Sequence, residues 1–208
     1  MLTDAHSHRV NTGEVNTVYN VRINDDPMSL PHGPRLYFSV GIHPWDADRF
    51  QPAWLDKLNM LLNYQQVVAI GECGLDKNSE AAMNNQLEVF ERQIILSEIA
   101  YKPLLIHCVG CFNELMELRG KHSPSQAWII HGFRGKPELA QQLLKAGFYL
   151  SYGEKHNAES VAATPPDRLL METDDSGKEL EEVAAAVAAH CKFALEELTA
   201  AEKLFRIK

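Results

Sequence analysis

Apolar runs rich in β-branched and aromatic residues alternate with stretches of helical periodicity along the 208 residues of the chain. This alternation is typical of an α/β fold with a parallel sheet. Eight strands are predicted, at Leu2–His8, Thr17–Ile23, Leu36–Ile42, Val67–Glu72, Pro103–Cys108, Ala127–His131, Phe148–Tyr152 and Arg168–Thr173. Eight parallel strands suggest a TIM-like (β/α)8 barrel, and a chain this close to the lower limit of about 200 residues predicts a trimmed one.

Helical patterns follow six of the predicted strands. We expect them at Pro52–Tyr64, Ala81–Ala100, Phe112–Arg119, Pro137–Ala146, Ala158–Ala163 and, as one long amphipathic helix, from Lys178 to about Phe205. The gap after His8 is too short for a helix, and the gap from Asp25 to Arg35 contains Pro27, Pro31 and Pro34. Helices are therefore expected to be missing after the first two strands. No linker, repeat or low-complexity tract divides the chain, which favours one domain.

The net charge of −8 and the pI near 5.6 leave no overall basic surface for binding polyanions. A nucleic-acid ligand would need a local basic patch or a metal. The start of the chain, MLTDAHSHR, has no basic segment followed by an apolar stretch, and no run approaches the ~18 uncharged apolar residues of a membrane span. These features predict a cytoplasmic protein that does not associate with membranes and has no obligate protein partner.

Four cysteines, Cys73, Cys108, Cys111 and Cys191, are too few for a disulfide framework, so reduced thiols are expected. Cys108 and Cys111 form a Cys-x-x-Cys, which suits a redox pair or half of a zinc site, but no second such pair exists. Side-chain alternation points Cys73 and Cys108 away from the barrel interior, where small buried apolar residues are the expected interpretation.

His6 and His8 are separated by one residue at the end of the first predicted strand. Because side chains alternate across a strand, both histidines face the same side and form half of a metal site. The alternative is a pair of surface histidines near the terminus. The choice depends on whether other strand ends supply the missing nitrogen and carboxylate ligands.

Residues that can bind metals follow several other predicted strands, at the carboxyl end where such barrels carry their chemistry. They are His43, Glu72, Asp76, His107, His131, Glu172 and Asp174. Taken alone, His107 or His131 would more often be a hydrogen-bonded core histidine. Ionisable residues at the ends of buried runs are costly to desolvate unless they are paired or metal-bound. Their joint occurrence indicates a divalent cation, whereas four other histidines are expected on the surface: His32, His122, His156 and His190.

These residues lie in motifs that resemble the TatD family of metal-dependent deoxyribonucleases, within the amidohydrolase-like barrel superfamily. The motifs are DAHSH, GIHPW, AIGECGLD, NNQLEVFERQIILSEIAYKPLLIH, HGFRG, FYLSYG and PPDRLLMETD. They occur in family order from Asp4 to Asp174 and cover most of the chain. The resemblance implies a single metal-dependent hydrolase barrel domain over residues 1–208.

The resemblance also implies a binuclear centre with two divalent metal ions, whose ligands would be His6, His8, Glu72, His107, His131 and Asp174. Asp174 would complete the site of the first histidine pair, the other two histidines would bind the second metal, and Glu72 would bridge both. A hydroxide held between the metals would attack the phosphoryl group, with Asp174 accepting the proton of the nucleophile. His43 would contact the phosphate or assist the leaving group, and its alternative is a turn residue ahead of a proline.

The chain departs from the family pattern in two places. Family members carry an arginine shortly after the strand-five histidine, whereas His107 is followed by a cysteine and a valine. After the strand-eight aspartate the family has a proline-containing loop and an Arg-Asn-x-Pro segment, whereas Asp174 is followed by Asp-Ser-Gly and a predicted helix. A more open site that lacks one phosphate-binding cation is expected. Arg134 and Lys155 could supply positive charge to the substrate instead, although both are also ordinary surface residues.

Three functions of different class fit these observations. The first is a divalent-metal-dependent phosphodiesterase that acts on DNA or a small phosphate ester. The second is a binuclear hydrolase of a small ester, amide or lactone, because the same metal-activated water attacks carbonyl carbon. The third is a non-catalytic metal-binding relative. Mixed histidine and carboxylate ligands suit Zn, Mn or Mg, so the residue types do not select among these metals.

Overall fold

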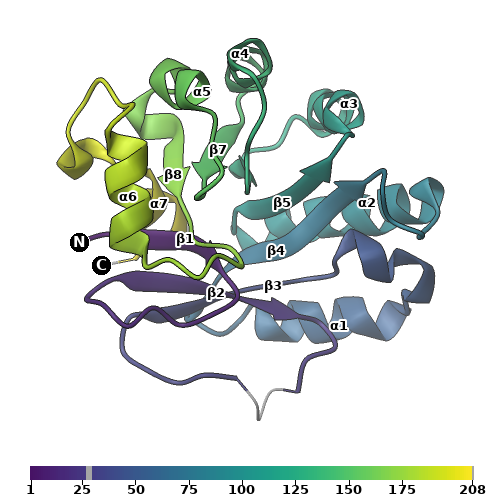
Figure 1. The fold of residues 1–208 in the computed structure, drawn as a ribbon. Helices are drawn as coiled ribbons and strands as arrows, with labels where there is room; N and C mark the ends of the chain where they lie inside the picture. Colours follow the sequence, from purple (N-terminus) through teal and green to yellow (C-terminus); the bar gives the residue numbers. More distant parts are fainter. Residues whose placement is uncertain (27–29, 208) are drawn as a thin grey trace. The chain divides into compact units, whose positions relative to one another are not determined.

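The computed structural model describes residues 1–26 and 30–207. The strands are β1 (Thr3–Ser7), β2 (Asn16–Arg22), β3 (Leu36–Gly41), β4 (Val67–Asp76), β5 (Leu104–Val109), β6 (Trp128–Ile130), β7 (Tyr149–Tyr152) and β8 (Leu169–Met171). The helices are α1 (Pro52–Leu61), α2 (Met83–Ala100), α3 (Phe112–His122), α4 (Pro137–Lys145), α5 (Ala158–Ala163), α6 (Leu180–Ala188) and α7 (Ala200–Phe205), with short 3-10 helices η2 (Pro44–Arg49), η3 (Pro166–Arg168) and η4 (Leu195–Glu197). The strand order β1 to β8 is that of a parallel (β/α)8 barrel, which confirms the predicted fold class (Figure 1).

The connections after the first two strands contain no helix among the described residues, as predicted. The link from β1 to β2 is too short for one, and the link from β2 to β3 is rich in proline. Pro27, one of the residues on which this prediction rested, lies outside the described residues. Thr17 N–H, in β2, donates to the Arg35 carbonyl at 2.9 Å. The residue that precedes β3 therefore pairs directly with β2.

The chain divides into two compact units, and the first comprises residues 1–19, 33–37 and 129–208. In this unit β8 pairs in parallel with both β1 and β7, and β6 pairs with β7. Helix α6 packs against β8 and α7 against β1, while α4 packs against β7 and α5. All residues of β1, β6 and β8 are buried, so the polar residues that follow these strands emerge from the core.

The second unit comprises residues 20–32 and 38–128. Its centre is β4, which pairs in parallel with β3 and β5. Helix α2 packs along β4 and also contacts η2, and α3 packs against β5 (Figure 1). All residues of β4 are buried, which matches its nearly continuous apolar sequence and the burial expected of a central parallel strand.

β4 extends beyond Glu72, where the prediction ended it, as far as Asp76. The reason is a close strand contact at Gly74, which has a φ of 132° and pairs with His107. A Cβ at this position would lie 2.1 Å from the His107 carbonyl oxygen, so only glycine permits the pairing to continue. The extension brings Asp76 to the end of the strand.

The prediction of one long C-terminal helix from Lys178 to about Phe205 was wrong. The segment forms α6, the short η4 and α7. No residue from Ala188 to Thr199 is buried, and a helix in a protein depends mostly on the packing of its apolar face. The Glu197 side chain accepts a hydrogen bond from Ala194 N–H at 2.8 Å, which starts a new turn after the break.

None of the helices in residues 1–26 and 30–207 combines the length and apolar character needed to cross a membrane. The longest, α2, carries charged residues such as Glu88 and Arg92, which pair with each other at 2.7 Å on its exposed face.

Candidate metal centre

His6, His8 and Asp174 come together in the first unit through a backbone bridge beyond the end of β1. Asp174 N–H donates to the His6 carbonyl at 2.9 Å, and His8 N–H donates to the Asp174 carbonyl at 3.1 Å. Asp174 Oδ1 lies 3.5 Å from His6 Nε2 and 3.6 Å from His8 Nε2. Three donor atoms thus converge within 4.8 Å of one another, an arrangement that could hold a metal ion.

His131 and Glu172 lie next to this group in the same unit. The His131 ring is 4.3 Å from the His6 ring between centroids, and its Nδ1 lies 3.4 Å from Glu172 Oε1. Gly132 N–H donates to the same carboxylate oxygen at 2.6 Å. His131, Glu172 and Asp174 offer a further set of three ligand atoms within 4.8 Å.

The surroundings of the Glu172 carboxylate indicate whether this part of the site suits a cation. Its side chain is fully buried, and within the described residues its Oε2 has no hydrogen-bond partner. A buried carboxylate oxygen without a donor is costly, and a cation removes that cost. The donor set of imidazole nitrogens and carboxylate oxygens is one that divalent transition metals accept. The residues present therefore fit a divalent cation.

Glu72, His43 and His107 form a second group, within the second unit. Glu72 Oε1 lies 2.8 Å from His107 Nδ1 and 3.2 Å from His43 Nε2, and the three residues offer ligand atoms within 4.8 Å. The backbone N–H of Glu72 donates to Asn20 Oδ1 at 2.9 Å, and Asn20 Nδ2 approaches Glu72 Oε2 at 3.4 Å. Glu72 is therefore held by both β4 and the end of β2.

His43 is almost completely buried at the start of η2. Its Nδ1 accepts a hydrogen bond from Trp45 N–H at 3.2 Å, which leaves Nε2 to carry the proton and face Glu72. Burial lowers the pKa of His43 below its ordinary value, although the hydrogen bond and charge of Glu72 act in the opposite direction. The predicted contact of His43 with substrate stays a prediction.

His107 has a carboxylate at each ring nitrogen. Its Nδ1 faces Glu72, and its Nε2 lies 3.0 Å from Asp76 Oδ2. A neutral imidazole has one N–H. If Nε2 carries it and donates to Asp76, Nδ1 has a free lone pair with which it can bind a cation. The pair of His107 and Asp76 is thus suited to orient a metal ligand.

Comparisons with known proteins show the family to which the chain belongs. Residues 6–202 match the model of the family described as TatD related DNase. The chain belongs to this family. It is 34% identical over 148 residues to a relative named as the uncharacterized metal-dependent hydrolase YabD of Bacillus subtilis, a match that covers 67% of this chain and 58% of that protein. It is 29% identical over 151 residues to the 3'-5' ssDNA/RNA exonuclease TatD of Salmonella typhimurium, covering 68% of this chain and 58% of that protein.

The matched region therefore spans little more than half the length of either of these TatD relatives. Among solved structures, the TatD homolog YJJV from Escherichia coli K12 matches with a TM-score of 0.81 at 19% identity, covering 100% of this chain and 98% of that chain. A TatD family hydrolase from Entamoeba histolytica matches with a TM-score of 0.64 at 22% identity, covering 82% of this chain and 72% of that chain. At these identities the structural matches show a shared fold.

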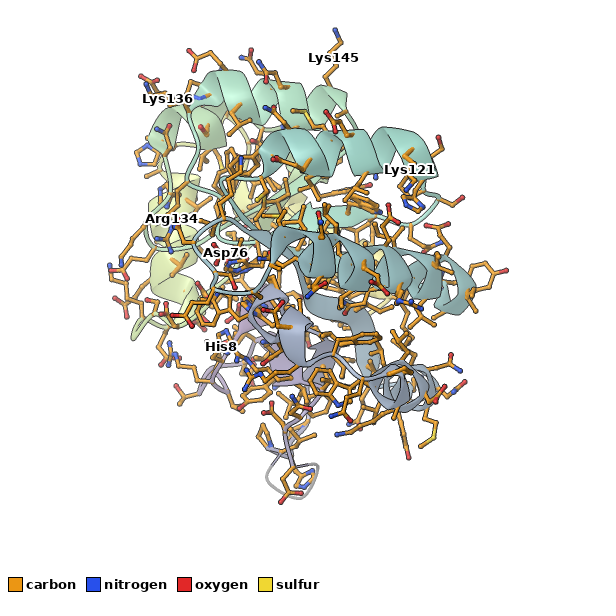
Figure 2. All side chains as sticks on the ribbon, turned by 90° about the vertical axis from the view of Figure 1, so that its right-hand side faces the viewer. His8, Asp76, Lys121, Arg134, Lys136 and Lys145 are labelled. Carbon is orange, nitrogen blue, oxygen red and sulfur yellow. The ribbon has the colours of Figure 1, made fainter. Side chains whose placement is uncertain are left out.

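Arg134 and Lys155, the predicted substitutes for the missing arginine of TatD proteins, line one pocket of the first unit. The pocket has a volume of about 270 Å³ and is also lined by Glu172 and Asp174. Both cations are exposed, and neither forms an ion pair within the part of the chain that the structure describes. Figure 2 labels Arg134 on the loop that leads into α4. The two side chains are therefore available to an anion beside the first ligand group.

Glu172 and Asp76, which the sequence places among the possible ligands at strand ends but to which the family resemblance gives no role, both contribute to the site. Glu172 is separated by one residue from Asp174, the same spacing that singled out the histidine pair, so strand alternation could have identified it. Asp76 lies four residues beyond the predicted end of its strand at Glu72, so strand alternation could not relate it to the other ligands.

Asp4 is a third carboxylate that was not assigned, and it supports the first group from within β1. It accepts hydrogen bonds from Thr173 Oγ1 at 2.6 Å and from Asn11 Nδ2 at 2.7 Å. Burial raises the pKa of Asp4 to about 6, although these hydrogen bonds lower it. Asp4 thereby joins β1 to the segment that carries Glu172 and Asp174.

The Cys-x-x-Cys pair shows no sign of redox or zinc chemistry. Cys108 and Cys111 are both free, and burial raises the pKa of Cys108 to about 12. Burial likewise raises the pKa of Cys111. A thiol is reactive as a thiolate, so these raised pKa values disfavour reactivity at this pair. Of the two cysteines expected to be buried, Cys73 is buried and Cys108 is half-buried.

Proposed function

We propose that this chain is a divalent-metal-dependent hydrolase that cleaves phosphodiester bonds in DNA. The observation that carries the proposal is the convergence of His6, His8 and Asp174 beside His131 and Glu172, with the exposed Arg134 and Lys155 lining the adjoining pocket. Membership of the TatD-related DNase family supports a nuclease. The Salmonella relative is named as a 3'-5' ssDNA/RNA exonuclease, which favours a single-stranded substrate.

We propose two divalent ions, Zn, Mn or Mg, held by the ligands that the resemblance implies. The first would be held by His6, His8 and Asp174 and the second by His107 and His131, with Glu72 as the bridging carboxylate. When bound, such ions lower the pKa of a water molecule and polarise the phosphoryl oxygens. The bridging role of Glu72 and the number of metals stay predictions.

The protein's own residues would position the phosphate and move the proton. Asp174 presents its carboxylate between two imidazoles, where it can accept the proton of the attacking water. Arg134 and Lys155 would hold non-bridging phosphate oxygens, because both residues line the same pocket as Asp174. His43 would assist the leaving group through Nε2, the nitrogen that faces Glu72.

The runner-up is hydrolysis of a small ester, amide or lactone by the same centre. The acidic net charge of −8 favours a small substrate over a polyanion. The exposed Arg134 and Lys155 favour a phosphate-containing one, and for that reason we place the phosphodiesterase first. A single hydrolase domain over residues 1–208 and a cytoplasmic location stay predictions.

One experiment tests this proposal. The purified chain is assayed with Mn, Mg or Zn on single-stranded DNA, on bis(4-nitrophenyl) phosphate and on a panel of carboxylic esters and lactones. Asp174→Asn should abolish hydrolysis of the phosphodiesters while leaving the fold intact, because asparagine tolerates the left-handed backbone of this position, whose φ is 54°. Asp167→Asn is the matched control and should retain activity, because Asp167 is 74% exposed and does not line the pocket.

Each other outcome selects a different function. Full activity in Asp174→Asn would rule out the proton-accepting role. Turnover of carbonyl substrates without turnover of any phosphodiester would establish the runner-up. Binding of one of the three metals without turnover of any substrate would leave the non-catalytic metal-binding relative.

A further inference from the structure

The indole of Trp45 lies beside the second ligand group and is held in one orientation. Its Nε1 donates to Asp76 Oδ2 at 2.8 Å, and its ring packs edge-on against the His43 ring with the centroids 4.7 Å apart. The side chain is nevertheless 52% exposed, although tryptophan is among the largest apolar side chains. A rigid aromatic surface is therefore open to a ligand next to residues of the candidate centre.

A pocket of about 320 Å³ adjoins this indole on the loop between β4 and α2. It is lined by Trp45, Asp76, Asn78, Ser79, Glu80 and Ala81. The two charged lining residues are carboxylates, and no lysine or arginine among the described lining residues offsets their repulsion of phosphate. Asn78 and Ser79 offer an amide and a hydroxyl, and the indole offers a flat apolar face. The pocket thus suits a neutral, planar group with hydrogen-bonding edges, as a nucleobase has.

Positive charge is available outside the pocket, close to the same ring. The Arg22 guanidinium lies over Trp45, 5.6 Å from the ring centroid, and is 39% exposed. Asp46 Oδ2 lies 3.9 Å from it, a distance typical of a weak ion pair. Single-strand binding sites combine this pair of features, an aromatic ring for the base and a cation for the backbone.

We propose that Trp45 is the stacking surface for one base of a single-stranded nucleic acid at the active site, with Asn78 and Ser79 facing the edge of that base. This inference rests on the proposed nuclease function, to which it adds a specificity-determining residue. Because every base has an aromatic face, stacking discriminates a base from an abasic backbone and not one base from another. Trp45 would therefore favour nucleic acid over other phosphodiesters without imposing a sequence preference.

The test compares the binding of two fluorescein-labelled, phosphorothioate-linked decamers in the presence of Mn, one of thymidylate and one of abasic spacers. Wild-type protein should bind the thymidylate decamer about 5- to 150-fold more tightly, the range for one base stacked on an aromatic ring. Trp45→Ala should lose this preference, and Trp45→Phe should keep most of it because a ring remains. The matched control is Tyr64→Ala, which removes an aromatic side chain that is 64% exposed and should leave the preference unchanged.

Equal binding of both decamers by the wild-type protein would overturn the inference. So would a Trp45→Ala variant that binds both decamers more weakly by the same factor, since that result indicates a structural role. Hydrolysis of bis(4-nitrophenyl) phosphate by the wild-type protein tests the proposed function separately. If the protein hydrolyses the phosphodiester but its preference for the thymidylate decamer does not depend on Trp45, the stacking site alone is refuted. If it shows the preference but no hydrolysis, the nuclease function alone is refuted.

Discussion

Asp4 and Thr173 are joined by two hydrogen bonds in the core of the first unit. Thr173 Oγ1 donates to Asp4 Oδ2 at 2.6 Å, and Thr173 N–H donates to Asp4 Oδ1 at 3.0 Å. Thr173 lies between Glu172 and Asp174, so this contact fixes the segment that carries both carboxylates against β1. The sequence motif DAHSH therefore contributes a structural carboxylate in addition to two candidate ligands.

The pKa of Asp4, raised by burial to about 6, predicts a pH-dependent stability. The folded protein retains the proton of Asp4 at pH values where the unfolded chain has released it. The contribution of Asp4 to the free energy of unfolding should therefore fall as pH rises from about 4 to about 6, by up to about 3 kcal/mol. Asp4→Asn cannot ionise, so its stability should lack this decline. Urea unfolding of both proteins in EDTA, at several pH values across this window, measures the difference.

Asp175→Asn is the control for this measurement, because Asp175 is exposed and its loss should leave the pH profile of wild-type stability unchanged. Parallel profiles for wild type and Asp4→Asn would contradict a raised pKa at Asp4.

Metal binding by the first ligand group should appear as a gain in thermal stability. A ligand at about 100 times its dissociation constant stabilises a protein by about 2.7 kcal/mol, which corresponds to a rise in Tm of about 5 to 10 °C for a chain of this size. His8→Ala should reduce the rise caused by Mn or Zn. The Tm of the metal-free variant should stay near that of the wild type, because the His8 side chain is 39% exposed.

His32→Ala, which removes an exposed histidine of the second unit, is the control and should keep the full rise in Tm. An unchanged rise in the His8→Ala variant would show that this residue is not a ligand.

Arg134 should contribute to phosphate binding more than to the chemical step. Loss of a hydrogen bond from an exposed charged group should raise KM for a phosphodiester by about 10-fold in Arg134→Ala, with a smaller effect on kcat. Lys145→Ala is a suitable control, because Lys145 lies at the opposite end of α4 from Arg134 (Figure 2). A loss confined to kcat would indicate a role in the transition state instead.

The strands and most helices could be predicted from the sequence because their apolar patterns match what the fold buries. The same alternation placed His6 and His8 on one side of β1, and the structure brings both within 3.6 Å of Asp174. Their roles as ligands stay predictions. The strand-end pattern singled out Glu72, His107 and His131 as possible ligands, whereas their separate roles came from the family resemblance.

Other features could not be predicted because they depend on contacts distant in sequence. The end of β4 is set by the fit of Gly74 against the His107 carbonyl, which no local rule anticipates. The break between α6 and α7 reflects the lack of buried residues there, although the local sequence favours helix. Tertiary packing therefore determines the secondary structure at the positions where local propensity predicts it incorrectly.

Asp76 should act as a positioning residue for His107. Burial raises the pKa of Asp76, but hydrogen bonds from Trp45, Asn78 and His107 hold it below its ordinary value, which favours the charged carboxylate. Asp76 Oδ2 then accepts a hydrogen bond from His107 Nε2 at 3.0 Å. Replacement of such a partner costs about 10- to 100-fold in metal affinity. Asp76→Asn should therefore weaken Zn binding by this factor, measured by competition with a chelating dye. Trp45→Phe removes the hydrogen bond from the indole to Asp76 but leaves the Asn78 and His107 contacts, so it should retain the wild-type affinity. Equal losses in the two variants would attribute the effect to the loop between β4 and α2 and not to the orientation of His107.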